Sequence, residues 1–133
     1  MSKFCIQPGN VSLSDLRTIW KTPLPISLGS ETAEMIEASR KTLEDIAVRH
    51  EVVYGVNTGF GLLANTRISD ADLSRLQINI VRSHAAGLGN YLEDRAVRLI
   101  MVLKINSLAR GYSGVGYHVL DTLLDFLNRE LYP

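Results

Sequence analysis

The segment from Glu93 to Arg110 is predicted to form a helix with apolar residues on nearly every side. These residues are Ala96, Val97, Leu99, Ile100, Met101, Val102, Leu103, Ile105, Leu108 and Ala109. A helix of this kind needs neighbours on most of its sides. The other predicted elements are too few to surround it. We therefore infer that its natural partners lie in missing sequence or in other subunits, and that an oligomer or a truncated protein explains this helix better than a monomer does.

Capping residues and helical spacing predict a mainly α fold. The remaining predicted helices run from Ser12 to about Trp20, from Ser30 to about Arg49, from Ser69 towards Gly87, and from Tyr117 to Arg129. A short strand is expected from Lys3 to Ile6, closed by the turn Pro8-Gly9-Asn10. At 133 residues, the chain has the length of one domain.

Charge and cysteine content exclude several classes of partner. Lys plus Arg and Asp plus Glu are equal at 14 each, which gives no electrostatic case for nucleic acid or anionic membranes. Cys5 is the only cysteine, and the N-terminus lacks a secretory signal. The aliphatic run Leu99–Leu103 is too short to span a bilayer. We expect a cytoplasmic protein with neither nucleic-acid nor membrane partners.

The octamer Tyr54-Gly55-Val56-Asn57-Thr58-Gly59-Phe60-Gly61 is the strongest candidate site. Its three glycines allow unusual backbone angles and close approach of a ligand. An ordinary β-turn with a half-buried tyrosine explains the octamer about equally well. A phosphate-binding loop is excluded, since Leu62-Leu63 follows the last glycine where a P-loop has Lys-Ser/Thr.

His84 extends the apolar stripe Leu73, Leu76, Ile80, Val81 of its predicted helix. A lone histidine at such a position is more often a hydrogen-bonded core residue than a functional group. Tyr54 lies thirty residues earlier, on the preceding loop, so the two side chains could face one cavity. A free tyrosine titrates near pH ~10 and is a poor base, but loop N–H groups or a cation could stabilise its phenolate.

The sequence gives little support for a metal site, a serine hydrolase or a role for the other histidines. No pair of histidines or carboxylates has metal-ligand spacing, so no metal site is expected. Ser113 is not flanked as in the Gly-x-Ser-x-Gly elbow of serine hydrolases, because Val115 stands where the second glycine would be. His50 and His118 lie near predicted helix ends and are expected to face solvent.

Two motifs together resemble the N-terminal region of the histidine ammonia-lyases. They are Val53 to Gly61 and the later pattern Leu76-Gln77-x-Asn79-x-x-x-Ser83-His84-Ala85-Ala86-Gly87. The stretches Pro8-Gly9-Asn10 and Asn106 to Gly114 fit the same family, so the resemblance covers essentially the whole chain. Ser83-His84 distinguishes the histidine enzymes from phenylalanine and tyrosine ammonia-lyases, although some aminomutases share it.

The resemblance implies a carbon-nitrogen lyase that converts L-histidine to trans-urocanate and ammonia in histidine degradation. Tyr54 would be the catalytic acid or base, His84 would bind substrate, and Gly59, Phe60 and Gly61 would form the active-site loop. The family uses a methylidene-imidazolone (MIO) prosthetic group made from an internal Ala-Ser-Gly, and no metal. The complete enzyme would be a homo-oligomer, a tetramer by this likeness.

The chain departs from the family in length and in lacking Ala-Ser-Gly. Residues 1–133 would thus be the N-terminal helical region of a longer lyase, inactive alone because the MIO-containing core is absent. An aromatic amino acid ammonia-lyase or a 2,3-aminomutase is the alternative within the class. A non-catalytic helical oligomerisation or binding module is the alternative outside it.

Overall fold

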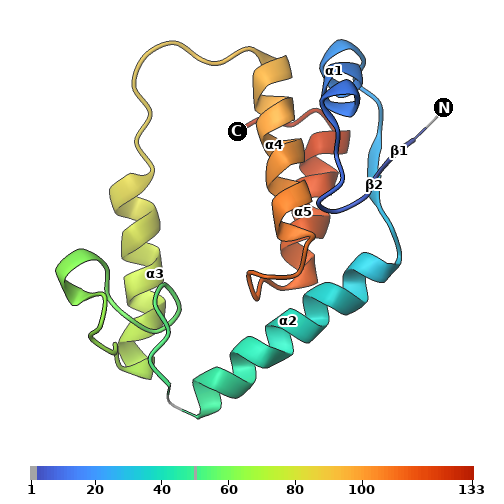
Figure 1. Ribbon diagram of the computed structural model, residues 1–133. Helices are drawn as coiled ribbons and strands as arrows, with labels where there is room; N and C mark the ends of the chain where they lie inside the picture. The colour runs from blue at the N-terminus through green and yellow to red at the C-terminus, as the bar shows by residue number, and fades with distance from the viewer. Residues whose placement is uncertain (1–2, 50) are drawn as a thin grey trace. The chain divides into compact units, whose positions relative to one another are not determined.

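The computed structural model describes residues 3–49 and 51–133, which form two compact units. The first unit combines the N-terminal part of the chain up to Leu43 with Tyr91–Pro133, and the second is Glu44–Asn90. His50, expected to face solvent, lies outside the described residues, whereas His118 is exposed as predicted. Figure 1 shows the elements of each unit.

The first unit holds most of the regular structure. Its elements are β1 (Phe4–Ile6), α1 (Leu13–Lys21), β2 (Ile26–Leu28), α4 (Asp94–Leu108) and α5 (Tyr117–Asn128). Helix α2 (Glu31–Val48) divides its residues between the two units. The second unit adds the 3₁₀ helix η1 (Gly61–Leu63) and α3 (Asp70–His84). The predicted mainly α class is confirmed, and the predicted helices begin and end within a few residues of the observed ones.

Side-chain caps start two of these helices as predicted. Ser12 and Asp15 form a capping box at α1, in which each side chain accepts a hydrogen bond from the other residue's backbone N–H. Ser69 accepts from the N–H of Asp72 at α3. Each cap satisfies an N–H group that a helix leaves unpaired in its first turn.

Strand β2 was not predicted from the sequence. It pairs in parallel with β1, with Phe4 opposite Ile26 and Ile6 opposite Leu28. On its other side, the Asn128 amide accepts from the Ile26 N–H at 2.8 Å and donates to the Ile26 carbonyl at 2.9 Å. A side chain at the end of α5 thus takes the place of a third strand at this residue.

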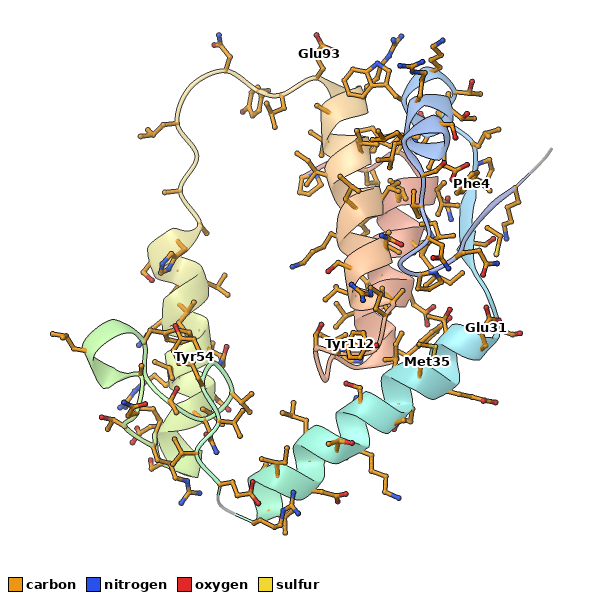
Figure 2. The ribbon with its side chains drawn as sticks, viewed as in Figure 1. Phe4, Glu31, Met35, Tyr54, Glu93 and Tyr112 are labelled. Atoms are coloured by element: carbon orange, nitrogen blue, oxygen red, sulfur yellow. The ribbon has the colours of Figure 1, made fainter. Side chains whose placement is uncertain are left out.

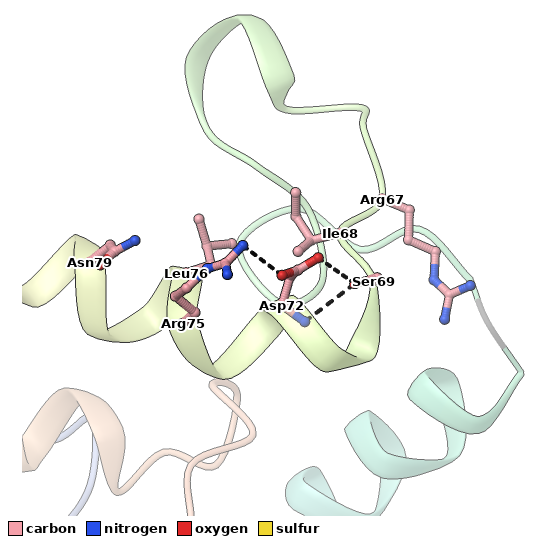
Figure 3. A pocket seen from close by; sticks show the side chains of 7 residues that line it. All are labelled: Arg67, Ile68, Ser69, Asp72, Arg75, Leu76 and Asn79. Carbon is pink, nitrogen blue, oxygen red and sulfur yellow. Dashed lines mark hydrogen bonds and ion pairs between the residues drawn. The ribbon is translucent and has the colours of Figure 1, made fainter.

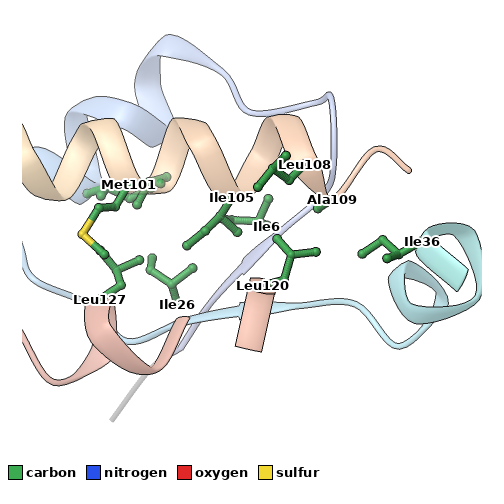
Figure 4. Close-up of a cluster of buried hydrophobic side chains, with 11 residues drawn as sticks. Ile6, Ile26, Ile36, Met101, Ile105, Leu108, Ala109, Leu120 and Leu127 are labelled. Atoms are coloured by element: carbon green, nitrogen blue, oxygen red, sulfur yellow. The ribbon is translucent and has the colours of Figure 1, made fainter. Parts of the chain in front are cut away.

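The core of the first unit lies where α4, α5, α1 and the two strands pack together (Figure 4). Its fully buried members include Ile6 and Ile26 from the strands, Val102 and Ile105 from α4, and Leu120 from α5. Fully burying one such side chain contributes roughly 1.5–3 kcal/mol. This core therefore fixes α4 and α5 against the sheet.

Helix α4 is only partly covered in this unit. Ile105 and Val102 are fully buried, but Ile100 is 54% exposed and Leu103 is 43% exposed. The helix was predicted to need neighbours on most of its sides. The first unit covers one face of it and leaves the face with Ile100 and Leu103 open. Within the described ranges, no helix has the length and apolar character needed to cross a membrane.

Candidate functional site

The glycine-containing loop of the second unit is built around two buried polar side chains, Asn57 and Thr58. Asn57 is 5% exposed; its amide oxygen accepts from the Val53 N–H at 2.8 Å, and its amide nitrogen donates to the Glu51 carbonyl at 2.7 Å. Thr58 is 1% exposed and donates to the Gly59 carbonyl at 2.9 Å. Asn and Thr readily bond nearby backbone in this way, which lets them shape a turn.

This loop also pairs with the segment that leads into α3. Gly59 N–H donates to the Thr66 carbonyl at 3.1 Å, and Ile68 N–H donates to the Asn57 carbonyl at 2.9 Å. Thr58 and Arg67 form an isolated antiparallel bridge between these bonds. The octamer is therefore anchored by backbone pairing near its second half.

Tyr54 lies at the surface of this loop (Figure 2), and the residue is 65% exposed. Its ring meets the Phe60 ring edge to face, with centroids 5.9 Å apart and planes at 67°. Gly55, directly after it, has φ of +78°, a conformation that glycine adopts without strain. The turn thus directs the phenol outward and folds the chain back so that Phe60 supports it.

The three predicted loop residues differ in their surroundings. Gly59 is buried, Phe60 is 43% exposed, and Gly61 has φ of +59° at the start of η1. The Tyr54 hydroxyl has no hydrogen-bond partner among the described residues. Stabilisation of its phenolate by loop N–H groups therefore stays a prediction.

His84 is the last residue of α3, and its side chain is exposed. Its Nδ1 lies 2.9 Å from the Ile80 carbonyl oxygen and 3.0 Å from Ser83 Oγ. The interpretation of His84 as a core residue is wrong for this unit, because the stripe beside it is itself open: Val81 is 66% exposed. Across residues 3–49 and 51–133, no hydrogen bond or ring contact joins His84 to Tyr54.

A shallow hollow of about 400 Å³ lies at the start of α3 (Figure 3). Its lining residues are Arg67, Ile68, Ser69, Asp72, Arg75, Leu76 and Asn79. The Asp72 carboxylate accepts from Ser69 Oγ and from the Arg75 guanidinium, both at 2.7 Å. This carboxylate is committed to holding the helix start, and none of the predicted site residues lines the hollow.

Asn57 and Thr58 support the loop structurally, and this role was not predicted from the sequence. Two small polar residues followed by a glycine, inside a turn-rich octamer, are the available signal. The described residues include no group of three or more His, Cys, Asp or Glu side chains placed to hold a metal ion.

Comparison with known proteins places this fold and loop in one class. Residues 11–133 match the family model described as aromatic amino acid lyase. The chain belongs to the aromatic amino acid lyase family.

Its relatives include histidine ammonia-lyases of several bacteria. Over all 133 residues the chain is 47% identical to the enzyme of Vibrio parahaemolyticus, 50% to that of Salmonella arizonae and 49% to that of Salmonella typhimurium. In each case, it spans 26% of the relative's length.

Solved structures of three related enzymes contain the same fold. Ergothionase from Treponema denticola matches 99% of this chain with a TM-score of 0.91 at 25% identity, over 27% of its own length. Phenylalanine aminomutase from Pantoea agglomerans matches 96% with a TM-score of 0.87 at 31% identity, over 25% of its length. Histidine ammonia-lyase from Trypanosoma cruzi matches 96% with a TM-score of 0.82 at 27% identity, over 25% of its length.

Proposed function

We propose that this chain is the N-terminal quarter of a histidine ammonia-lyase, a cytoplasmic homo-oligomer that converts L-histidine to trans-urocanate and ammonia. The observation that carries the proposal is the match of all 133 residues to histidine ammonia-lyases at 47–50% identity. The phenylalanine aminomutase structure is only 31% identical, below the identity to these histidine enzymes. L-histidine is therefore better supported as the substrate than an aromatic amino acid.

Tyr54 is proposed as the group that exchanges a proton with the substrate. A phenol serves as acid or base only where substrate can reach it, and Tyr54 is 65% exposed beside Phe60. Asn57 and Thr58 hold the backbone on either side of the turn. Gly59, Phe60 and Gly61 would then form the wall of the substrate site next to the phenol.

His84 is proposed as a substrate-binding residue. Its imidazole is exposed at the end of α3, and one nitrogen is already committed to the helix. The second nitrogen is left to meet a polar group of the substrate. The approach of Tyr54 and His84 to one substrate is part of this proposal and is tested by the variants described below.

The MIO group of the family does not fit the residues present here. Its Ala-Ser-Gly precursor does not occur in the 133 residues, and the nearest tripeptide is Tyr112-Ser113-Gly114. Tyr112 is bulky and 81% exposed, and the Gly114 N–H already donates to Ser39 Oγ at 3.1 Å. We therefore assign no prosthetic group to these residues, and we expect the 133-residue chain alone to be inactive.

The partly open face of α4 supports association with further protein. Ile100 and Leu103 remain exposed there, as do Ile78 and Val81 on α3. In the complete enzyme we expect the remaining three quarters of the chain and the other subunits of a tetramer to provide this cover.

Substrate assays of the complete protein test the proposal. Urocanate formation can be followed by its ultraviolet absorbance with L-histidine, and L-tyrosine and L-phenylalanine serve as competing substrates. Turnover of L-histidine alone supports the assignment. Turnover of an aromatic amino acid, or formation of a β-amino acid, would instead assign an aromatic ammonia-lyase or a 2,3-aminomutase.

Urocanate formation by the purified 133-residue chain would contradict its predicted inactivity. A specific complex with no lyase activity in any form would favour a binding module.

A further inference from the structure

Three polar atoms meet at the last turn of α3. His84 Nδ1 lies 2.9 Å from the Ile80 carbonyl oxygen, and Ser83 Oγ lies 3.0 Å from the same oxygen. Ser83 Oγ also lies 3.0 Å from His84 Nδ1. The three atoms therefore form a closed triangle of hydrogen-bond distances.

The chemistry of the carbonyl assigns the protons in this triangle. A carbonyl oxygen only accepts, so an Nδ1 atom at 2.9 Å must carry the proton. An unprotonated Nδ1 would bring two lone pairs together at that distance. Ser83 then donates its own proton to the Ile80 carbonyl. Its oxygen also accepts from the Nδ1–H, so that this N–H is shared between two acceptors. The triangle holds a neutral His84 as the Nδ1–H form, and its Nε2 carries a lone pair.

We propose that Ser83 is a positioning residue that fixes the tautomer and ring orientation of His84, so that Nε2 is presented to substrate as a hydrogen-bond acceptor. This inference rests on the proposed function, because it makes the ligand of His84 a hydrogen-bond donor. The imidazole N–H of L-histidine is such a donor, whereas the phenyl ring of phenylalanine has none. A polar group left without its partner in a closed site lowers the affinity for the wrong substrate.

Ser83 contributes what the carbonyl alone does not provide. The Ile80 oxygen fixes one direction of the Nδ1–H, but an exposed ring held by one bond can still turn about its side-chain torsions. The Ser83 hydroxyl adds a second contact on the same nitrogen and is itself held by the carbonyl. Removing the hydroxyl should therefore loosen the ring while leaving α3 intact.

Solid-state nitrogen-15 NMR of the complete enzyme, labelled with ¹⁵N-histidine, tests the tautomer without reference to activity. Subtracting the spectrum of His84→Gln identifies the His84 signals. We expect the neutral ring of His84 to carry its proton on Nδ1 and to leave Nε2 unprotonated. Ser83→Ala should shift these signals towards a mixture of tautomers, and Ser83→Thr, which keeps the hydroxyl, should restore them. A His84 that is protonated at Nε2 in the wild-type enzyme, or a spectrum unchanged by Ser83→Ala, would overturn the inference.

Kinetics provide the second readout. Loss of one hydrogen bond should raise the KM for L-histidine by about 2–10-fold in Ser83→Ala, with a smaller change in kcat and recovery in Ser83→Thr. Ser74→Ala, on an exposed serine of the same helix, is the matched control and should leave KM unchanged. A wild-type enzyme that does not act on L-histidine would refute the proposed function, while the NMR result would still decide the tautomer.

Discussion

The side-chain amide of Asn128 pairs with both backbone polar groups of Ile26, which lies 102 residues earlier in the chain. Ile26 is 1% exposed, so its N–H and carbonyl have little access to water. A buried backbone group that loses its partner costs about 1–3 kcal/mol. This one side chain therefore joins the end of α5 to strand β2.

Asn128→Ala should lower the free energy of unfolding of the purified chain by about 1–3 kcal/mol, because it leaves both Ile26 groups unpaired. Urea titration followed by helical circular dichroism measures the change. Asn10→Ala is the matched control in the same unit, since the Asn10 side chain is exposed and the turn bond there is made by its backbone N–H. Equal stability of the two variants would contradict the bridging role.

Arg98→Met should destabilise the first unit more strongly, by about 2–4 kcal/mol. Arg98 is 4% exposed and donates to the carbonyls of Leu24 and Leu127, so it joins the β2 approach to the end of α5. Methionine keeps the apolar stem but removes the guanidinium, so the Leu24 carbonyl loses its donor, whereas the Leu127 carbonyl still accepts from the Glu130 N–H at 3.3 Å. Arg95→Met removes an exposed arginine of the same helix and should change the urea midpoint little. A similar midpoint for both variants would mean that the buried hydrogen bonds contribute little net stability.

Gly111→Ala should cost at least about 2 kcal/mol, because backbone strain and steric conflict act together. Gly111 has φ of +72°, and an added Cβ would lie 2.8 Å from the Met35 carbonyl oxygen. Gly9→Ala separates the two effects: its φ is +85°, but its Cβ would meet only the flexible Arg110 side chain at 3.4 Å. We expect about 1 kcal/mol for that variant by thermal or urea unfolding. A larger loss for Gly9→Ala than for Gly111→Ala would refute the steric argument.

Asp15 should make the stability of α1 depend on pH in the acidic range. A hydrogen bond from the Ser12 hydroxyl, and then one from the Ser12 N–H, lowers the pKa of Asp15 below 3.8 in the folded chain. The stabilisation is therefore fully present above the unfolded pKa and is lost as pH falls through the folded pKa. Urea midpoints of the wild type and Asp15→Asn should differ at neutral pH and converge at acidic pH. A constant difference at all pH values would show that the charge is not responsible.

Local signals in the sequence predict the helices of this chain well. Ser12 and Ser69 are caps because their side chains bond to N–H groups within three residues, so the sequence around each residue is sufficient. The mainly α class and the apolar character of α4 follow from patterns of similar range. The resemblance to ammonia-lyases likewise depends on short motifs, and the family match confirms it.

Contacts between distant residues could not be predicted in this way. Strand β2 has three residues, Ile26–Leu28, which is too short for an alternating pattern, and it depends on β1 and Asn128 for its pairing. The exposure of His84 was also not predicted. An apolar stripe on a helix indicates that the stripe is buried, but it does not say which part of a longer protein covers it. Burial of Asn57 and Thr58 depends on how the octamer folds back on the segment before α3.

Tyr54→Phe is the sharpest test of the proposed chemistry in the complete enzyme. The change removes only the hydroxyl, so the ring contact with Phe60 and the turn at Gly55 should persist. If the phenol exchanges the substrate proton, kcat for L-histidine should fall by at least about 100-fold, with a smaller effect on KM. Tyr91→Phe, at another exposed tyrosine, should keep the wild-type kcat. Near wild-type turnover by Tyr54→Phe would exclude the hydroxyl from proton transfer, because no other atom differs between the two enzymes.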